Sequence, residues 1–153
     1  MKFLSQNFVK YGLIMIAVMM GCLALMEITG QNKTFEHSPI AAFYTFIAPL
    51  IVWFFGLRAK KKSQDGQLAY RQGLFEGFKI SVVYAVFSPF ITLAYYTLIN
   101  PAIVASTREA YMLKDATDAT VIQVDMFVQF VSALIFGTLC GAILSLFLKT
   151  RRQ

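Results

Sequence analysis

Two carboxylates and one amide are the side chains whose positions most favour ion binding. Glu27 lies at the end of one long apolar segment, and Asp125 lies near the start of another. An acidic side chain at the edge of a membrane span is costly to dehydrate and is a functional candidate by default. Gln129 follows Asp125 by four residues, so the two share one helical face. Glu27, Asp125 and Gln129 are therefore the candidate proton- or cation-binding residues.

Such a site requires Glu27 and Asp125 to converge, and the sequence leaves this open. If the two carboxyls meet, one of them can hold a proton or both can share a cation. If they stay apart, each reaches interfacial water and pairs with a nearby cation such as Lys33, Arg108 or Lys114. Convergence favours a small proton- or cation-coupled transporter, whereas separation favours a structural role.

The other side chains that could bind a metal lack the additional ligands that would complete a site. His37 is the only histidine, and Cys22 and Cys140 stand inside apolar segments without a CxxC or Cys–His cluster. Sulfur side chains do share one helical face: Met15, Met19, Cys22 and Met26. Such ligands suit Cu(I), but methionine is equally an ordinary apolar filler. We expect no metal, no other cofactor and no disulfide.

Motifs of the common enzyme classes are also missing. The chain has no glycine loop of the Walker A type, no HExxH and no GxSxG. The polar side chains within the apolar segments are too few to build a nucleophile, a base and an oxyanion site. We therefore expect that the protein is not an enzyme.

The composition explains why polar residues are so scarce. The 153 residues are 58% hydrophobic and 14% charged, whereas soluble domains are about 45–50% apolar and about 25% charged. The net charge of +6 does not indicate nucleic acid, because the basic residues flank apolar segments instead of covering a polar domain. This pattern is typical of a membrane protein that contacts lipid headgroups.

Four apolar segments are long enough to cross a bilayer, which takes about 20 helical residues. They are residues 11–28, 39–57, 78–99 and 121–148. The predicted fold class is all-α: a polytopic membrane protein with a bundle of four transmembrane helices in a single domain, residues 1–153. The first segment starts like a signal peptide, but its apolar residues continue past Cys22 without a cleavage site. We expect it to be retained.

The distribution of basic residues predicts the orientation of this bundle across the membrane. One side holds eleven of the 14 lysines and arginines: Lys2, Lys10, Arg58, Lys60, Lys61, Lys62, Arg71, Lys79, Lys149, Arg151 and Arg152. The other side holds three: Lys33, Arg108 and Lys114. By the positive-inside rule both termini and the basic segment 56–79 are cytoplasmic.

Small residues mark the helix faces that are expected to pack. They recur at helical spacing in the third and fourth spans: Gly73, Gly77, Ser81, Ser88, Gly137 and Gly141. In lipid, such residues let helix backbones approach closely. The face of the third span could instead line a polar conduit, and the Gly137–Gly141 pair serves a neighbouring helix or a second copy equally well.

Three short stretches carry a resemblance to a known family. They are YRQGLFEGFK at residues 70–79, YYTLINP at residues 95–101, and the final span with its basic tail. Taken together, the chain resembles the domain of unknown function 4199, small four-helix membrane proteins chiefly of Bacteroidetes. The resemblance covers nearly the whole chain. It implies a bacterial inner-membrane protein with no established activity, so it supplies no catalytic residues.

These observations predict a non-enzymatic packing or interaction component of the bacterial inner (cytoplasmic) membrane. Its expected partners are membrane lipid and either further copies of itself or another membrane protein, but not nucleic acid. The alternative is the coupled transporter that would use Glu27 and Asp125.

Overall fold

The computed structural model describes residues 6–30 and 43–150. Within these ranges the chain is all-helical and has no strand. Five α-helices are present: α1 (Asn7–Ile28), α3 (Ala48–Lys62), α4 (Tyr70–Ala94), α5 (Ile103–Ala110) and α6 (Asp118–Leu148). Two π-helical turns adjoin them: η2 (Phe43–Ile47) before α3 and η3 (Tyr95–Ile99) after α4.

Three of the described helices are long and apolar enough to cross a membrane. They are α1, the continuous stretch Tyr70–Ile99, and α6, with mean hydropathies of 2.1, 1.7 and 2.3. Helices of this length need a bilayer, or an equally large apolar environment, to cover them. The chain is thus a membrane protein by the length and composition of its helices.

The second predicted span, residues 39–57, begins outside the described residues. Its described part consists of η2 and α3, and α3 alone has 15 residues. The helix continues past Leu57, and its last turn holds Lys60, Lys61 and Lys62. Lysines suit this position because they compensate the negative end of the helix dipole.

The third predicted span, residues 78–99, lies within a longer continuous helical stretch, Tyr70–Ile99. The helix begins at Tyr70 and so includes Glu76, which is only 3% exposed. The side-chain amide of Asn7 on α1 donates to the Glu76 carboxylate at 2.8 Å and to the carbonyl of Gly56 at 2.9 Å. A hydrogen-bonded carboxylate can be buried inside a packed helix, so this helix is longer than its apolar run.

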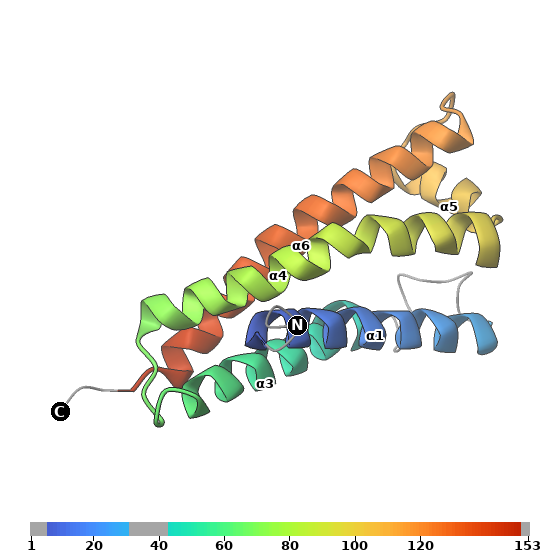
Figure 1. Ribbon diagram of the computed structural model, residues 1–153. Helices are drawn as coiled ribbons and strands as arrows, with labels where there is room; N and C mark the ends of the chain where they lie inside the picture. The colour runs from blue at the N-terminus through green and yellow to red at the C-terminus, as the bar shows by residue number, and fades with distance from the viewer. Residues whose placement is uncertain (1–5, 31–42, 151–153) are drawn as a thin grey trace.

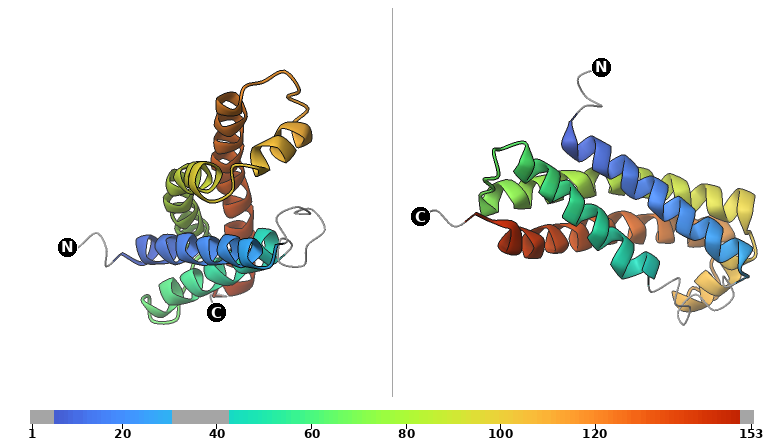
Figure 2. Two further views of the ribbon diagram at one scale, coloured as in Figure 1. Left: turned by 90° about the vertical axis from the view of Figure 1, so that its right-hand side faces the viewer. Right: turned by 90° about the horizontal axis from the view of Figure 1, so that it is seen from below.

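The helices form two pairs (Figure 1). The most extensive contact joins α4 and α6, which cross and then diverge toward the end of the molecule that holds α5, here called the α5 end. The helices α1 and α3 lie beside each other, α1 against α4 and α3 against both α4 and α6 (Figure 2). At the opposite end, here called the loop end, residues 63–69 connect α3 to α4.

The α4–α6 contact is built from small residues in antiparallel register. Gly77 faces Gly141 so closely that a methyl group placed on Gly77 would lie 2.8 Å from the Gly141 Cα. One helical turn away on either side, Gly73 meets Ser145 and Gly137 meets Ser81. Backbone contact at this distance leaves no room for any larger side chain.

The apolar core lies where α6 meets α1, α3 and α4. Trp53, which is 1% exposed, sits at its centre and contacts Phe136 with ring centroids 6.0 Å apart. The sulfur side chains that share a face of α1 are all buried: Met15, Met19, Cys22 and Met26. In this structure they form the inner face of α1, and Met15 and Met19 belong to the same cluster as Trp53.

The loop end is tied to the end of α6 by hydrogen bonds. Lys61 Nζ donates to the carbonyl of Leu148 at 2.9 Å. Thr150 donates through its backbone N–H to the Leu68 carbonyl at 3.0 Å and through its hydroxyl to the Gly66 carbonyl at 3.1 Å. The lysine satisfies a carbonyl that the last turn of α6 leaves without a partner, and Thr150 fixes the α3–α4 loop against the end of α6.

Candidate functional site

Asp125 lies at the α5 end of the molecule and is buried among tyrosines. Its carboxyl group is 4% exposed and accepts one hydrogen bond on each oxygen. Tyr96 donates to Oδ2 at 2.9 Å, and Tyr111 donates to Oδ1 at 2.5 Å. Hydrogen bonds to a charged acceptor are about twice as strong as neutral ones, so this carboxylate is held firmly.

Glu27 lies at the same end and accepts a hydrogen bond from Tyr95, the residue next to Tyr96. Tyr95 donates to Glu27 Oε2 at 3.1 Å, and the side-chain amide of Asn100 donates to the same oxygen at 3.4 Å. The Tyr95 and Tyr96 rings have centroids 6.2 Å apart. The structure therefore brings the two acids to consecutive tyrosines of one helix, although each acid has its own set of donors.

The α-helical period of α4 carries both tyrosines to its packed face. Buried residues recur along α4 in adjacent pairs such as Ile80–Ser81, and Tyr95 follows Gly77 by 18 residues, which is five turns. Tyr95 and Tyr96 are the next buried pair. The π-turn η3 begins there, and in it the backbone N–H of Asn100 bonds to the carbonyl of Tyr95, five residues earlier, at 2.8 Å.

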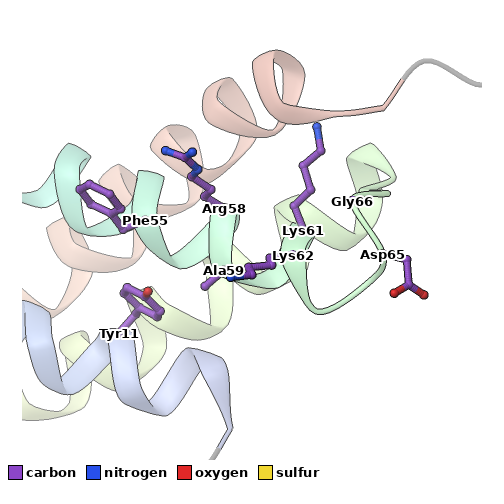
Figure 3. A pocket seen from close by; sticks show the side chains of 8 residues that line it. All are labelled: Tyr11, Phe55, Arg58, Ala59, Lys61, Lys62, Asp65 and Gly66. Carbon is purple, nitrogen blue, oxygen red and sulfur yellow. The ribbon is translucent and has the colours of Figure 1, made fainter.

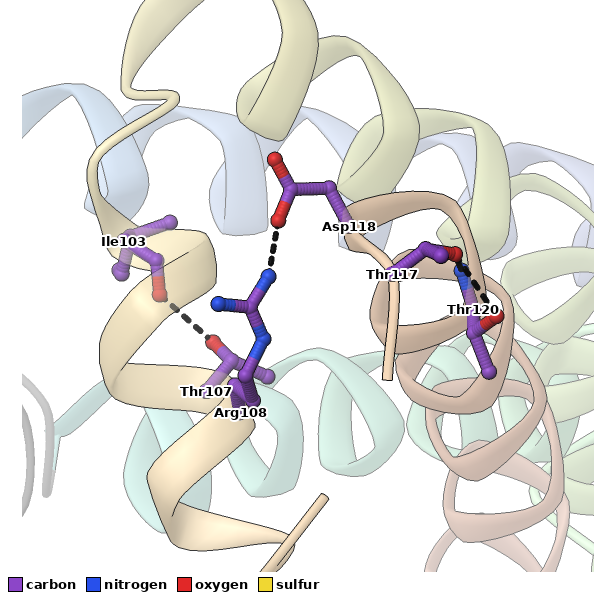
Figure 4. Close-up of polar contacts among 6 residues, drawn as sticks. All are labelled: Ile103, Thr107, Arg108, Thr117, Asp118 and Thr120. Carbon is purple, nitrogen blue, oxygen red and sulfur yellow. Dashed lines mark hydrogen bonds and ion pairs between the residues drawn. The ribbon is translucent and has the colours of Figure 1, made fainter. Parts of the chain in front are cut away.

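The helix α5 positions the remaining donors against α6. Thr107 Oγ1 lies 3.1 Å from the Tyr96 hydroxyl and also donates to the Ile103 carbonyl at 3.0 Å. Arg108 forms an ion pair with Asp118 in the first turn of α6 (Figure 4). Just before that turn, Thr117 caps α6 by accepting from the Thr120 N–H at 3.3 Å.

Tyr111 stands at the junction between α5 and α6. Burial, followed by the hydrogen bond to the Asp125 carboxylate, raises the pKa of the Tyr111 phenol above its ordinary value. The phenol therefore stays protonated and donating throughout the neutral range.

The other predicted site residue and its expected cations take different positions. Gln129 lies one turn along α6 from Asp125 and is half-buried. Arg108, a predicted partner for the acids, pairs with Asp118 instead. Lys114 is exposed, and Lys33 and His37 lie outside the described residues.

The residues predicted for helix packing lie in the interior. Gly73, Gly77 and Ser81 of α4 face α6, and Gly137 and Gly141 of α6 face α4. Ser88 is buried in α4, where its hydroxyl donates to the Ala85 carbonyl at 3.2 Å. Gly137 and Gly141 are thus engaged within the chain, which leaves no room on that face for a second copy.

Glu76, Tyr96 and Tyr111 are the polar residues that sequence reasoning missed. Glu76 has a signal in the sequence, because it follows Gly73 by three residues and precedes Ile80 by four, on the face that packs. Tyr111 has none, because it lies in a loop far from any periodic pattern. Among the described residues no group of three or more His, Cys, Asp or Glu side chains could hold a metal ion.

The model of one protein family, described as protein of unknown function (DUF4199), matches residues 10–150. No curated protein and no solved structure matches the chain. The family match spans every described helix except the first turn of α1.

Proposed function

The chain belongs to the DUF4199 family of proteins of unknown function, so a role can be inferred only from the residues of the chain itself. From these residues we propose that the protein is a non-enzymatic interaction component of the bacterial inner membrane. It crosses the membrane four times, with α3 and the residues before it as the second span. Both termini and the loop end face the cytoplasm, as the excess of basic residues there favours.

The pairing of buried polar groups supports this proposal. In the described residues every buried serine, aspartate and glutamate has a hydrogen-bond partner within the chain: Glu76, Ser81, Ser88, Asp125 and Ser145. A catalytic site instead keeps a nucleophile or base open toward its substrate. Glu76 and Asp125 join different helices through these bonds, whereas each serine bonds to a carbonyl of its own helix.

The exposed apolar side chains supply the surface for interaction. On α6 they recur about every fourth residue on the face away from α4: Phe127, Ile135, Leu139, Ile143 and Phe147. Lipid covers such a face in an isolated copy, and another membrane protein covers part of it in a complex.

Photocrosslinking tests this role directly. With a photoreactive amino acid at Ile135 or Ile143 of α6, or at Phe87 or Phe90 of α4, we expect irradiated membranes to give a protein adduct from at least one position. The same probe at buried Val121 should give none beyond the chain itself. Adducts with lipid alone from all four exposed positions would count against a protein-interaction role.

A coupled transporter is the second candidate. It is favoured because Glu27 and Asp125 accept hydrogen bonds from two adjacent tyrosines. It predicts a proton or cation flux into vesicles containing the protein, and loss of that flux in Asp125→Asn. The matched control is Asp115→Asn, because Asp115 is exposed in the loop before α6. Pure vesicles that carry no flux with the unmodified chain would remove this candidate.

A further inference from the structure

A basic groove opens at the loop end of the molecule, between α1, α3 and the α3–α4 loop (Figure 3). Its lining combines aromatic and basic side chains: Tyr11, Phe55, Arg58, Ala59, Lys61, Lys62, Asp65 and Gly66. Its volume of about 660 Å³ lies within the range of about 300–1,000 Å³ that small-molecule sites occupy. None of these residues takes part in the cluster around Asp125.

The groove has cations that no acidic side chain neutralises. Arg58 and Lys62 are exposed, and neither forms an ion pair within the described part of the chain. Lys61 donates one of its three N–H groups to the Leu148 carbonyl, so two remain for a ligand. Asp65, the acidic member, lies at the opposite edge from Arg58, with its carboxylate turned outward (Figure 3). The groove is therefore suited to an anion.

The wall of the groove is fixed by close helix packing. Tyr11 packs on Gly56 of α3, where a methyl group would lie 3.2 Å from the Tyr11 ring and 2.7 Å from Ile80. Asn7 adds a hydrogen bond from α1 to the Gly56 carbonyl. Side chains on rigid, packed helices hold a ligand more accurately than side chains on loops.

The order of residues along α3 matches the layers of a bilayer surface. Phe55, Arg58 and Lys62 follow one another at spacings of three and four residues, so they lie along one face. The stripe rises about 10 Å at 1.5 Å per residue, which is long enough to cross the headgroup layer of about 5–8 Å on one side of a bilayer. The aromatic end points toward the hydrocarbon, and the cationic end points toward the phosphates.

We propose that this groove binds the phosphate of an anionic phospholipid from the cytoplasmic leaflet. The Arg58 guanidinium takes the phosphate in a two-point contact, as its planar fork allows, and Lys62 adds a second cation. Tyr11 and Phe55 pack against the glycerol and the first part of the acyl chains. Lys10, whose Nζ lies 5.9 Å from the Tyr11 ring centroid, adds charge at the rim. The inference rests on the cytoplasmic placement of the loop end.

Native mass spectrometry of protein extracted from phosphatidylcholine vesicles containing phosphatidylglycerol tests the groove. We expect the unmodified chain to retain one phosphatidylglycerol. The double variant Arg58→Gln, Lys62→Gln should retain it about 30-fold less, since each cation near an anionic surface contributes about fivefold. The matched control is Lys60→Gln, Arg71→Gln, which removes the same charge from the same end outside the groove and should bind like the unmodified chain.

Three results would overturn the inference. Equal loss in both double variants would mean general surface attraction, and undiminished retention in the groove variant would mean that the lipid binds elsewhere. Displacement of the lipid by millimolar inorganic phosphate would assign the groove to a soluble anion. Size-exclusion profiles establish that the variants remain folded.

Labelling of Ser63→Cys with a membrane-impermeant maleimide separates the two proposals. Ser63 directly follows α3 and is exposed. Labelling only after permeabilisation supports the cytoplasmic placement, and a failure to retain lipid would then overturn the groove alone. Labelling of intact cells would overturn the proposed orientation itself.

Discussion

Replacing Gly77 with leucine is expected to separate α4 from α6 and to lower the free energy of unfolding by about 3 kcal/mol. The methyl group of an alanine at this position would already lie 2.8 Å from the Gly141 Cα, and a leucine adds three more carbons. The obstacle is backbone, which cannot rotate away as a flexible side chain can. Overpacking of this kind costs about 1–3 kcal/mol or more.

Unfolding by increasing mole fractions of sodium dodecyl sulfate in mild detergent provides the measurement. Trp53 reports on the α4–α6 interface, because it is buried there against Gly137. The matched control is Gly21→Leu, at an exposed glycine of α1 with no atom within 4 Å of its methyl position. A Gly77→Leu protein that unfolds together with the unmodified chain would show that α4 and α6 do not pack through these glycines.

Replacing Asp125 with leucine is expected to release α5 from α6. Leucine branches at the same carbon as aspartate but accepts no hydrogen bond, so the Tyr96 and Tyr111 hydroxyls both lose their shared acceptor. A buried hydroxyl without a partner costs about 1–3 kcal/mol. Tyr96 keeps Thr107 as a neighbour, so we expect a loss of about 3 kcal/mol in total.

Hydrogen exchange of the α5 amides measures this release, and a loss of this size accelerates exchange about 100-fold. Asp125→Asn retains one acceptor oxygen and should lie between the leucine variant and the unmodified chain. Asp115→Leu, in the exposed loop before α6, should leave exchange unchanged. If α5 exchanges equally in all four proteins, then the Asp125 cluster does not hold it in place.

The location of Glu27 and Asp125 could be predicted, but not their partners. Both acids border apolar runs, and counting residues along each span brings them to the same end of the molecule. Their donors come from η3 and from the loop after α5, and Tyr96 and Tyr111 are separated from Asp125 by 29 and 14 residues. A period of 3.6 residues places Tyr95 on the same face of α4 as Gly77, 18 residues earlier, but it cannot show which carboxylate lies opposite each tyrosine.

The small residues show a second feature that the sequence could not predict, which is the partner of each packing face. The spacing of Gly73, Gly77 and Gly137, Gly141 identifies faces that allow close approach. It does not choose between a neighbouring helix and another copy, because both give the same contacts. Only the arrangement of the helices shows that Gly77 faces Gly141 in the same chain.

The boundaries of the helices follow packing more closely than hydropathy. Apolar content predicts a third span from residue 78, and α4 extends before it to Tyr70, where Asn7 satisfies the Glu76 carboxylate inside the packed helices. The end of α3 shows the same effect, since Lys61 is held by its bond to the end of α6. Contacts between distant segments determine both positions, and no window along the sequence contains them.

The order of α4 and α6 along the chain also sets an order of assembly during synthesis. The ribosome delivers α4 to the membrane before α6 exists, so Gly73, Gly77 and Ser81 first meet acyl chains instead of their final neighbours. Insertion of each helix must therefore precede their association, and lipid must leave the glycine face when α6 arrives. Completion of the core around Trp53 is accordingly a late event in the biogenesis of this protein.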